Sequence, residues 1–121
     1  MKSLQTPTDD DLTGLLPLSA AGFFVLFALT NGEKHGYWMM QEIAELSGGK
    51  MRMGPATLYT NVQRFVEQEF IEEIESHASD RRRTYRLSPS GRRLLQAELR
   101  RQEEVLRIAR SRKVFASGGN A

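Results

Sequence analysis

The sequence contains no cysteine and only two histidines among its 121 residues, which narrows the chemistry available to it. Without thiols there is no disulfide bond, no thiolate nucleophile and no cysteine-ligated metal site. His35 and His77 are far apart, and no ligand spacing around them is typical of a metal centre. A glycine-rich phosphate loop is also absent. These absences predict a protein that is not an enzyme and that holds no metal or cofactor.

The sequence also lacks a long apolar run. The longest, residues 20–29, is about half the length of a membrane-spanning helix. The composition, 40% hydrophobic and 26% charged, is ordinary for one globular domain. Together with the absence of cysteine, it predicts a cytoplasmic protein without membrane association.

Positive charge is scarce in the first two thirds of the chain. Residues 1–80 hold five cations against twelve carboxylates, whereas residues 81–121 hold twelve cations against three carboxylates. The formal net charge of +2 conceals this division. A basic region of this kind suits a polyanion such as nucleic acid, although a solvated arginine-rich helix has the same composition.

Apolar periodicity and helix-starting residues such as Ser19, Pro55 and Ser88 define the expected elements. We expect a disordered arm at residues 1–14, helices at 20–30, 35–46, 55–68 and 89–113, strands at 71–77 and 83–87, and a flexible tail at 114–121. This order predicts a mainly α-helical fold with a small β-hairpin. It corresponds to a winged helix-turn-helix domain at residues 15–88 followed by a long C-terminal helix.

The expected helix at residues 55–68 carries an apolar and a polar face. At 100° per residue, its apolar side chains fall within an arc of about 100°. The separate polar arc holds Thr57, Thr60, Asn61 and Arg64. Asparagine can pair with adenine and arginine with guanine, so this face suits a DNA major groove, although an ordinary exposed helix face looks similar in isolation. Lys50 and Arg52 precede the helix, where phosphates would pass.

The turn between the expected strands carries Arg81, Arg82 and Arg83 in succession. Three guanidinium groups on a hairpin tip suit contact with phosphates or a minor groove. Because the hairpin directly follows the candidate recognition helix, the two features together favour double-stranded DNA as a partner.

The last expected helix carries a long apolar stripe that includes Leu95, Leu99 and Leu106. The stripe extends beyond a compact three-helix core and therefore predicts a homodimer interface, with packing onto its own domain as the alternative. The helix at residues 20–30 is apolar almost all round, so Phe23 and Phe27 are expected to join this interface. In the second helix, Trp38, Met39 and Met40 could line a ligand pocket, but their spacing favours the core. His35 is expected to be a structural residue at the start of that helix.

Several short motifs occur in order between residues 15 and 112. They are Leu16-Pro17-Leu18-Ser19, His35-Gly36-Tyr37, Gln41-Glu42-Ile43, Gly54-Pro55-Ala56-Thr57-Leu58-Tyr59, Phe70-Ile71-Glu72-Glu73, Arg81-Arg82-Arg83-Thr84-Tyr85-Arg86-Leu87-Ser88 and Gly91-Arg92. In this order and spacing the chain resembles short members of the PadR family of transcriptional regulators.

The resemblance implies a homodimeric repressor whose third helix enters the major groove and whose wing contacts the flanking backbone. It implies that the last helix forms the dimer, and that Thr57 and Tyr59 lie in the motif that starts the recognition helix. Ala56 stands where the family usually has glycine. Some members hold flat ligands against a tryptophan in the last helix, which this chain lacks, because its only tryptophan is Trp38.

The sequence therefore predicts a homodimeric repressor that binds a palindromic operator. Two alternatives stay open. In one, an unknown small-molecule effector at the dimer interface weakens DNA binding. In the other, the winged helix binds proteins and not DNA.

Overall fold

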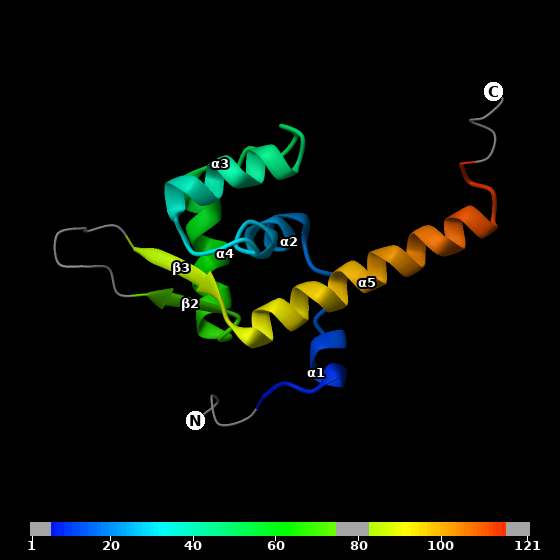
Figure 1. The fold of residues 1–121 in the computed structure, drawn as a ribbon, viewed down its shortest axis with the longest axis horizontal. Coiled ribbons are helices and arrows are strands. Elements are labelled where there is room, and N and C mark those ends of the chain that lie inside the picture. Colours follow the sequence, from blue (N-terminus) through cyan, green and yellow to red (C-terminus); the bar gives the residue numbers. More distant parts are fainter. Residues whose placement is uncertain (1–5, 75–82, 116–121) are drawn as a thin grey trace.

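The computed structural model describes residues 6–74 and 83–115 (Figure 1). Its elements in chain order are α1 (Asp9–Thr13), α2 (Ala20–Phe27), β1 (Lys34–His35), α3 (Gly36–Leu46), α4 (Pro55–Glu67), β2 (Ile71–Ile74), β3 (Thr84–Leu87) and α5 (Pro89–Ser111). The helix pair α3–α4 followed by the β2–β3 hairpin confirms the predicted winged helix-turn-helix fold with a long last helix.

The strands form one antiparallel sheet in the order β1-β3-β2. In the hairpin, Ile71 pairs with Leu87 and Ile74 with Thr84. On the other edge, Lys34 of β1 pairs with Tyr85. The sequence did not predict β1, because two residues are too few to show strand periodicity. Arg81 and Arg82 of the expected hairpin tip, and His77 at the end of the first expected strand, lie outside the described residues.

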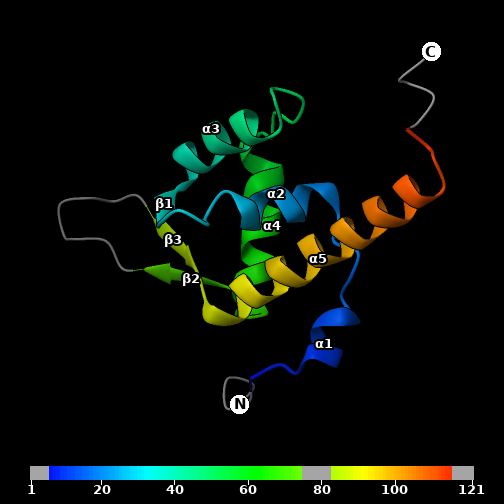
Figure 2. The ribbon, with the colours of Figure 1, turned by 45° about the vertical axis from the view of Figure 1, so that its right-hand side comes forward.

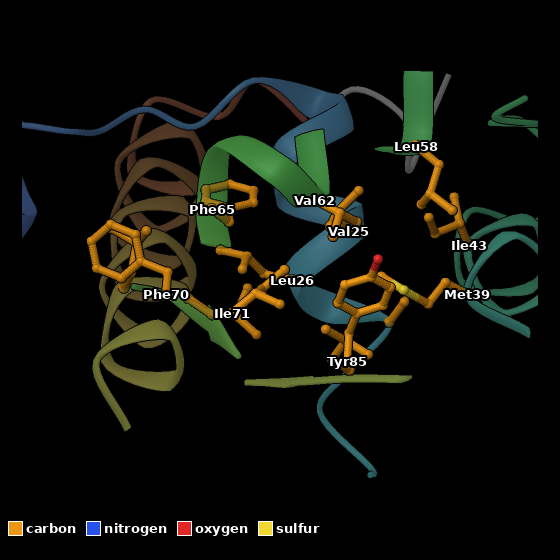
Figure 3. Close-up of a cluster of buried hydrophobic side chains, with 14 of the residues drawn as sticks. Val25, Leu26, Met39, Ile43, Leu58, Val62, Phe65, Phe70, Ile71 and Tyr85 are labelled. Atoms are coloured by element: carbon orange, nitrogen blue, oxygen red, sulfur yellow. The ribbon is translucent and has the colours of Figure 1, made fainter. Parts of the chain in front are cut away.

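The core is built around α2, which packs against α3, α4 and α5 (Figure 2). Val25 and Leu26 of α2 are fully buried among side chains from α3, α4 and the sheet (Figure 3). Met39 and Ile43 come from α3 and Leu58 from α4, so the apolar face of each amphipathic helix points towards α2. A helix as apolar as α2 requires cover on several sides, and its own chain supplies most of it.

The prediction of a disordered arm at residues 1–14 is wrong for the part that the structure describes. Thr8 and Asp11 form a capping box that starts α1, with the Thr8 N–H donating to Asp11 Oδ2 over 3.0 Å. Leu12 is buried, and Asp9 pairs with Arg93 of α5 at 3.0 Å. A five-residue helix shows no apolar periodicity, so only its tertiary contact with α5 reveals it.

The first turns of α5 are fixed to the turn that precedes β2. Ser88 caps the helix, accepting from the Gly91 N–H at 2.9 Å and donating to the Glu69 carbonyl at 2.7 Å. A Cβ at Gly91 would lie 2.0 Å from the Phe70 carbonyl oxygen, so only glycine fits there. Leu95 is 2% exposed within its own domain, which corrects its expected place in a dimer interface.

Glu98 is a buried carboxylate in α5, 1% exposed. It accepts hydrogen bonds from the Arg101 guanidinium at 3.0 and 2.8 Å, from Gln102 Nε2 at 2.8 Å and from the Leu18 N–H at 3.3 Å. The Arg101 bonds, helped by those from Gln102 and Leu18, lower the pKa of Glu98 to about 2, although burial acts to raise it. Glu98 thereby ties α5 to the segment that leads into α2.

Gly36 and Tyr59 bring the start of α3 close to α4. A Cβ at Gly36 would lie 2.0 Å from the Tyr59 hydroxyl oxygen and 2.7 Å from its Cζ atom. The Tyr59 ring also approaches the buried Tyr85 ring of β3, with centroids 6.5 Å apart. The space at Gly36 therefore sets where Tyr59 lies between α3 and the sheet.

We expect Glu98→Gln to lower the free energy of unfolding at pH 7 by about 1–3 kcal/mol, because charge-assisted hydrogen bonds are lost. The pKa of Glu98 is lowered from 4.5 to about 2, so its charge stabilises the fold above about pH 4.5 and less as the pH falls towards 2. The difference between the wild type and the variant should shrink across that window. Urea unfolding at several pH values measures it. Glu103→Gln, an exposed change on the same helix, is the control, and an unchanged pH dependence in Glu98→Gln would contradict the assignment.

We expect Gly36→Ala to cost roughly 1–3 kcal/mol of stability, because its Cβ overlaps Tyr59. In a Tyr59→Ala background the same change should be neutral or stabilising, since alanine favours helices over glycine. Chemical unfolding of the four proteins in the cycle measures the coupling. Gly14→Ala, where the nearest atoms would lie 3.6 Å away, serves as the control. An equal cost in both backgrounds would show that the Tyr59 contact is not the cause.

Candidate nucleic-acid interface

The exposed face of α4 differs from the predicted one by a rotation of the helix. The buried residues are Leu58, Asn61, Val62 and Phe65. Around the helix axis, Asn61 lies about 40° from Phe65, so the side of α4 that packs against α2 includes Asn61. Val66, at the opposite edge of that side, is only half-buried. Thr57, Thr60 and Arg64 stay exposed, as does Tyr59 at 43%.

Asn61 is 6% exposed, so its expected place on the exposed polar arc is wrong. Its Nδ2 donates to the Thr57 carbonyl at 2.9 Å, and its Oδ1 accepts from Arg64 Nη2 at 2.6 Å. A buried amide is stable in this place because both ends are paired. Asn61 therefore holds the Arg64 guanidinium at the edge of the exposed face, where that group also lies 6.0 Å from the Phe65 ring centroid.

Gln63 occupies the centre of the exposed face, and the sequence analysis missed it. It lies about 60° from Thr60 and about 40° from Tyr59 around the helix, and both neighbours are exposed. Its amide has the donor and acceptor pair that the adenine edge requires. An apolar arc that includes Val66 leaves Gln63 outside both the apolar and the polar face. The buried position of Asn61 is what moves Gln63 to the centre.

An open groove of about 1140 Å³ borders this face of α4 and reaches α3 and β3. Gln63 and Arg64 line it from α4, and Arg83 and Tyr85 from the wing side. Burial raises the pKa of Tyr85, as does the nearby Glu73 carboxylate, against a hydrogen bond from Arg83. Arg83 is itself paired with Glu73 at 3.5 Å and stays largely exposed. The groove thus places the polar face of α4 beside the base of the basic hairpin.

Lys50 and Arg52 lie exposed in the segment between α3 and α4. The segment leads to Gly54, the N-cap of α4, which has no side chain to bond the first backbone N–H groups. Pro55 occupies the first turn. The two cations and the helix N-terminus together make this end of α4 electropositive.

The apolar stripe of α5 divides at Glu98. Leu94 and Leu95, before Glu98, are buried in the domain. After it the helix projects away from the rest of the fold (Figure 1), with Leu99 38%, Val105 51% and Leu106 42% exposed. Phe23 and Phe27 of α2 are half-buried, with ring centroids 5.3 Å apart. The expected interface residues other than Leu95 therefore keep exposed apolar surface.

Across residues 6–74 and 83–115, histidines and carboxylates do not gather into any group of three or more that could hold a metal ion. In the same ranges, every helix is too short or too polar to cross a membrane.

Two curated proteins resemble the chain. The transcriptional regulator Rv3488 of Mycobacterium tuberculosis is 32% identical over 90 residues, which cover 74% of this chain and 81% of that protein. An uncharacterised 37.1 kDa protein in a transposon of Streptomyces fradiae is 36% identical over 78 residues, or 64% of this chain. The chain spans only 21% of the length of that second relative.

Solved structures share the fold. A transcriptional regulator from Clostridium thermocellum superposes with a TM-score of 0.65 at 19% identity, covering 86% of this chain and 95% of the other. Bacillus subtilis PadR, solved in complex with operator DNA, has a TM-score of 0.59 at 20% identity, covering 67% of this chain and 47% of the other.

The family follows from the sequence match and agrees with the fold. Residues 25–97 match the sequence model of the transcriptional regulator PadR-like family, and they run from α2 into the buried half of α5. They include α3, α4 and both strands of the wing. The chain therefore belongs to the PadR-like family of transcriptional regulators.

Proposed function

We propose that this chain is a homodimeric repressor that binds a palindromic operator in double-stranded DNA. The observation that carries the proposal is the exposed polar face of α4 beside the base of the arginine-rich hairpin. A helix with small and amide side chains on its exposed face fits a major groove, and a basic hairpin next to it fits the adjacent phosphates. Bacillus subtilis PadR, which shares the fold, was solved in complex with operator DNA, and this supports DNA as the partner.

Gln63 and Thr60 are the base-reading residues in this proposal, in place of Asn61. Both are exposed on one face of α4, and Gln63 can make a bidentate contact with adenine. Arg64, held by Asn61, lies one helical turn beyond Thr60 and contacts a guanine or a phosphate. Thr57 and Tyr59, near the start of α4, contact the sugar-phosphate backbone at the edge of the groove.

Five cations supply phosphate contacts in the same proposal. Lys50 and Arg52 flank the electropositive end of α4, and Arg83 stands at the base of the wing. Arg81 and Arg82 precede Arg83 in the chain and lie outside the described residues. These contacts make binding strong at low salt and weak at high salt, whatever the DNA sequence.

The dimer in this proposal forms through the second half of α5. The apolar residues Leu99 and Leu106 lie on the part of the helix that projects from the domain, where more than a third of the surface of each residue stays exposed. The half-buried Phe23 and Phe27 of α2 offer a complementary apolar surface to the partner's helix. Two α4 helices related by a two-fold axis would then read half-sites about 34 Å apart.

We expect Gln63→Ala to weaken binding to the operator by about 1–3 kcal/mol and to leave binding to random DNA nearly unchanged, because only the base contact is lost. Fluorescence anisotropy with a duplex from the promoter of its own gene and a scrambled duplex, at one salt concentration, measures both affinities. Gln68→Ala, an exposed amide at the end of the same helix, is the matched control. Equal losses on the two duplexes would remove Gln63 from base reading. A wild-type protein that binds neither duplex would overturn DNA binding and favour a protein-interaction module.

We expect Leu106→Asp to convert the dimer into a monomer, because a carboxylate in an apolar interface loses its hydration. The side chain is 42% exposed, so the domain itself should keep its helical content. Light scattering at micromolar concentration gives the mass, and circular dichroism checks the fold. Gln96→Asp makes the same change of charge at an exposed position of α5. A monomeric wild type, or a dimer that survives Leu106→Asp, would contradict the interface.

A further inference from the structure

Two large aromatic side chains of α3 are exposed at the surface. Tyr37 is 55% and Trp38 53% exposed, and their rings meet edge to face with centroids 5.2 Å apart. The sequence favoured a core position for Trp38, but the buried positions of α3 belong to Met39 and Ile43. Trp38 precedes that buried face and projects from it, so its indole ring is available to a ligand.

A groove of about 580 Å³ lies against Trp38. One wall is a single face of α3, formed by Trp38, Gln41, Glu42 and Glu45 at spacings of three, four and seven residues. The other wall is the β1 edge of the sheet with Glu33, Lys34 and His35. The groove is separate from the exposed face of α4, sharing only His35 with the groove described above.

The groove carries a net negative charge. Three carboxylates line it. After Glu72, the Glu33 carboxylate also helps to raise the pKa of Arg86 by electrostatic attraction. Glu42 and Glu45 have no ion pair or hydrogen bond from a side chain within residues 6–74 and 83–115. The only cation in the lining, Lys34, donates its Nζ to Asn31 Oδ1. Two unpaired carboxylates beside an exposed indole ring attract a cation and repel an anion.

His35 adds an unpaired polar atom to the same wall. Its Nδ1 is buried and has no hydrogen-bond partner among the described residues. Its ring centroid lies 6.3 Å from that of Trp38. Buried polar atoms in native proteins are normally paired, so this atom is an exception in the wall of the groove.

We propose that the groove between α3 and β1 binds a small organic cation, with an alkylated ammonium group against the Trp38 indole and with Glu42 and Glu45 as its counter-charges. An aromatic face attracts an ammonium group electrostatically and covers its methyl groups, which water solvates poorly. A bare metal ion would instead require several converging carboxylates, and the described residues form no such group. The proposal is independent of DNA binding.

Trp38 is the only tryptophan in the chain, so intrinsic fluorescence reports on this groove directly. The test titrates the full-length protein with choline chloride at low salt. Sodium chloride at equal ionic strength and 3,3-dimethylbutan-1-ol, the uncharged analogue of choline, run beside it. We expect a saturable change in fluorescence with choline alone. No saturable change, or equal binding of the uncharged analogue, would overturn the proposal.

Two variants locate the site. Glu42→Gln and Glu45→Gln should each weaken choline binding about three- to tenfold, the effect of one counter-charge near the surface. Glu103→Gln on the distant α5 should bind as the wild type does. Saturation-transfer NMR from the protein to the choline methyl groups extends the test to Trp38→Ala, which should lose the signal while circular dichroism remains unchanged. Retained transfer in Trp38→Ala would place the ligand elsewhere.

Discussion

The burial of α2 is the constraint on which the other elements depend. Every residue of α2 is alanine, glycine or a large apolar residue, so the helix has no polar face. The helices α3, α4 and α5 must therefore each turn an apolar side towards it. Val25 and Leu26 are fully enclosed as a result. The rotation of α4 about its own axis follows from this packing. The residues that α4 presents to solvent are those that α2 does not cover, and they include Gln63 in place of Asn61.

Two polar side chains in the interior add specific hydrogen bonds to the apolar packing. Within α4, the Asn61 side chain accepts a hydrogen bond from the Arg64 guanidinium. In α5, the Glu98 carboxylate accepts one from the backbone N–H of Leu18. Both side chains are nearly fully buried, and both have their hydrogen-bonding atoms paired. The hydrogen bond from Leu18 to Glu98 therefore helps to fix α5 relative to the segment that leads into α2, whereas the bonds of Asn61 lie within α4 and fix the Arg64 side chain.

The two halves of α5 lie in different environments. Up to Glu98 it is part of the domain core, clamped by Ser88 and Gly91 against the turn before β2. Beyond Glu98 its large apolar side chains are exposed over a third or more of their surface, and the proposed dimer would cover them. In the proposed dimer, this division would connect dimerisation to the reading of DNA. Any change in the direction of α5 would move the α4 helix of each domain relative to its partner.

The sequence by itself determined the order and type of the main elements, because periodicity and capping are local properties. Ser19, Pro55 and Ser88 mark helix starts within their own few residues, and the apolar positions that follow need no knowledge of the fold. Only the tertiary structure decided the short elements α1 and β1, which exist through contacts with α5 and β3. It also decided that Asn61 and Leu95 are buried and that Gln63 and Trp38 are exposed. A helical wheel gives the angles between side chains but not the direction of the core, and that direction depends on neighbours far away in the chain.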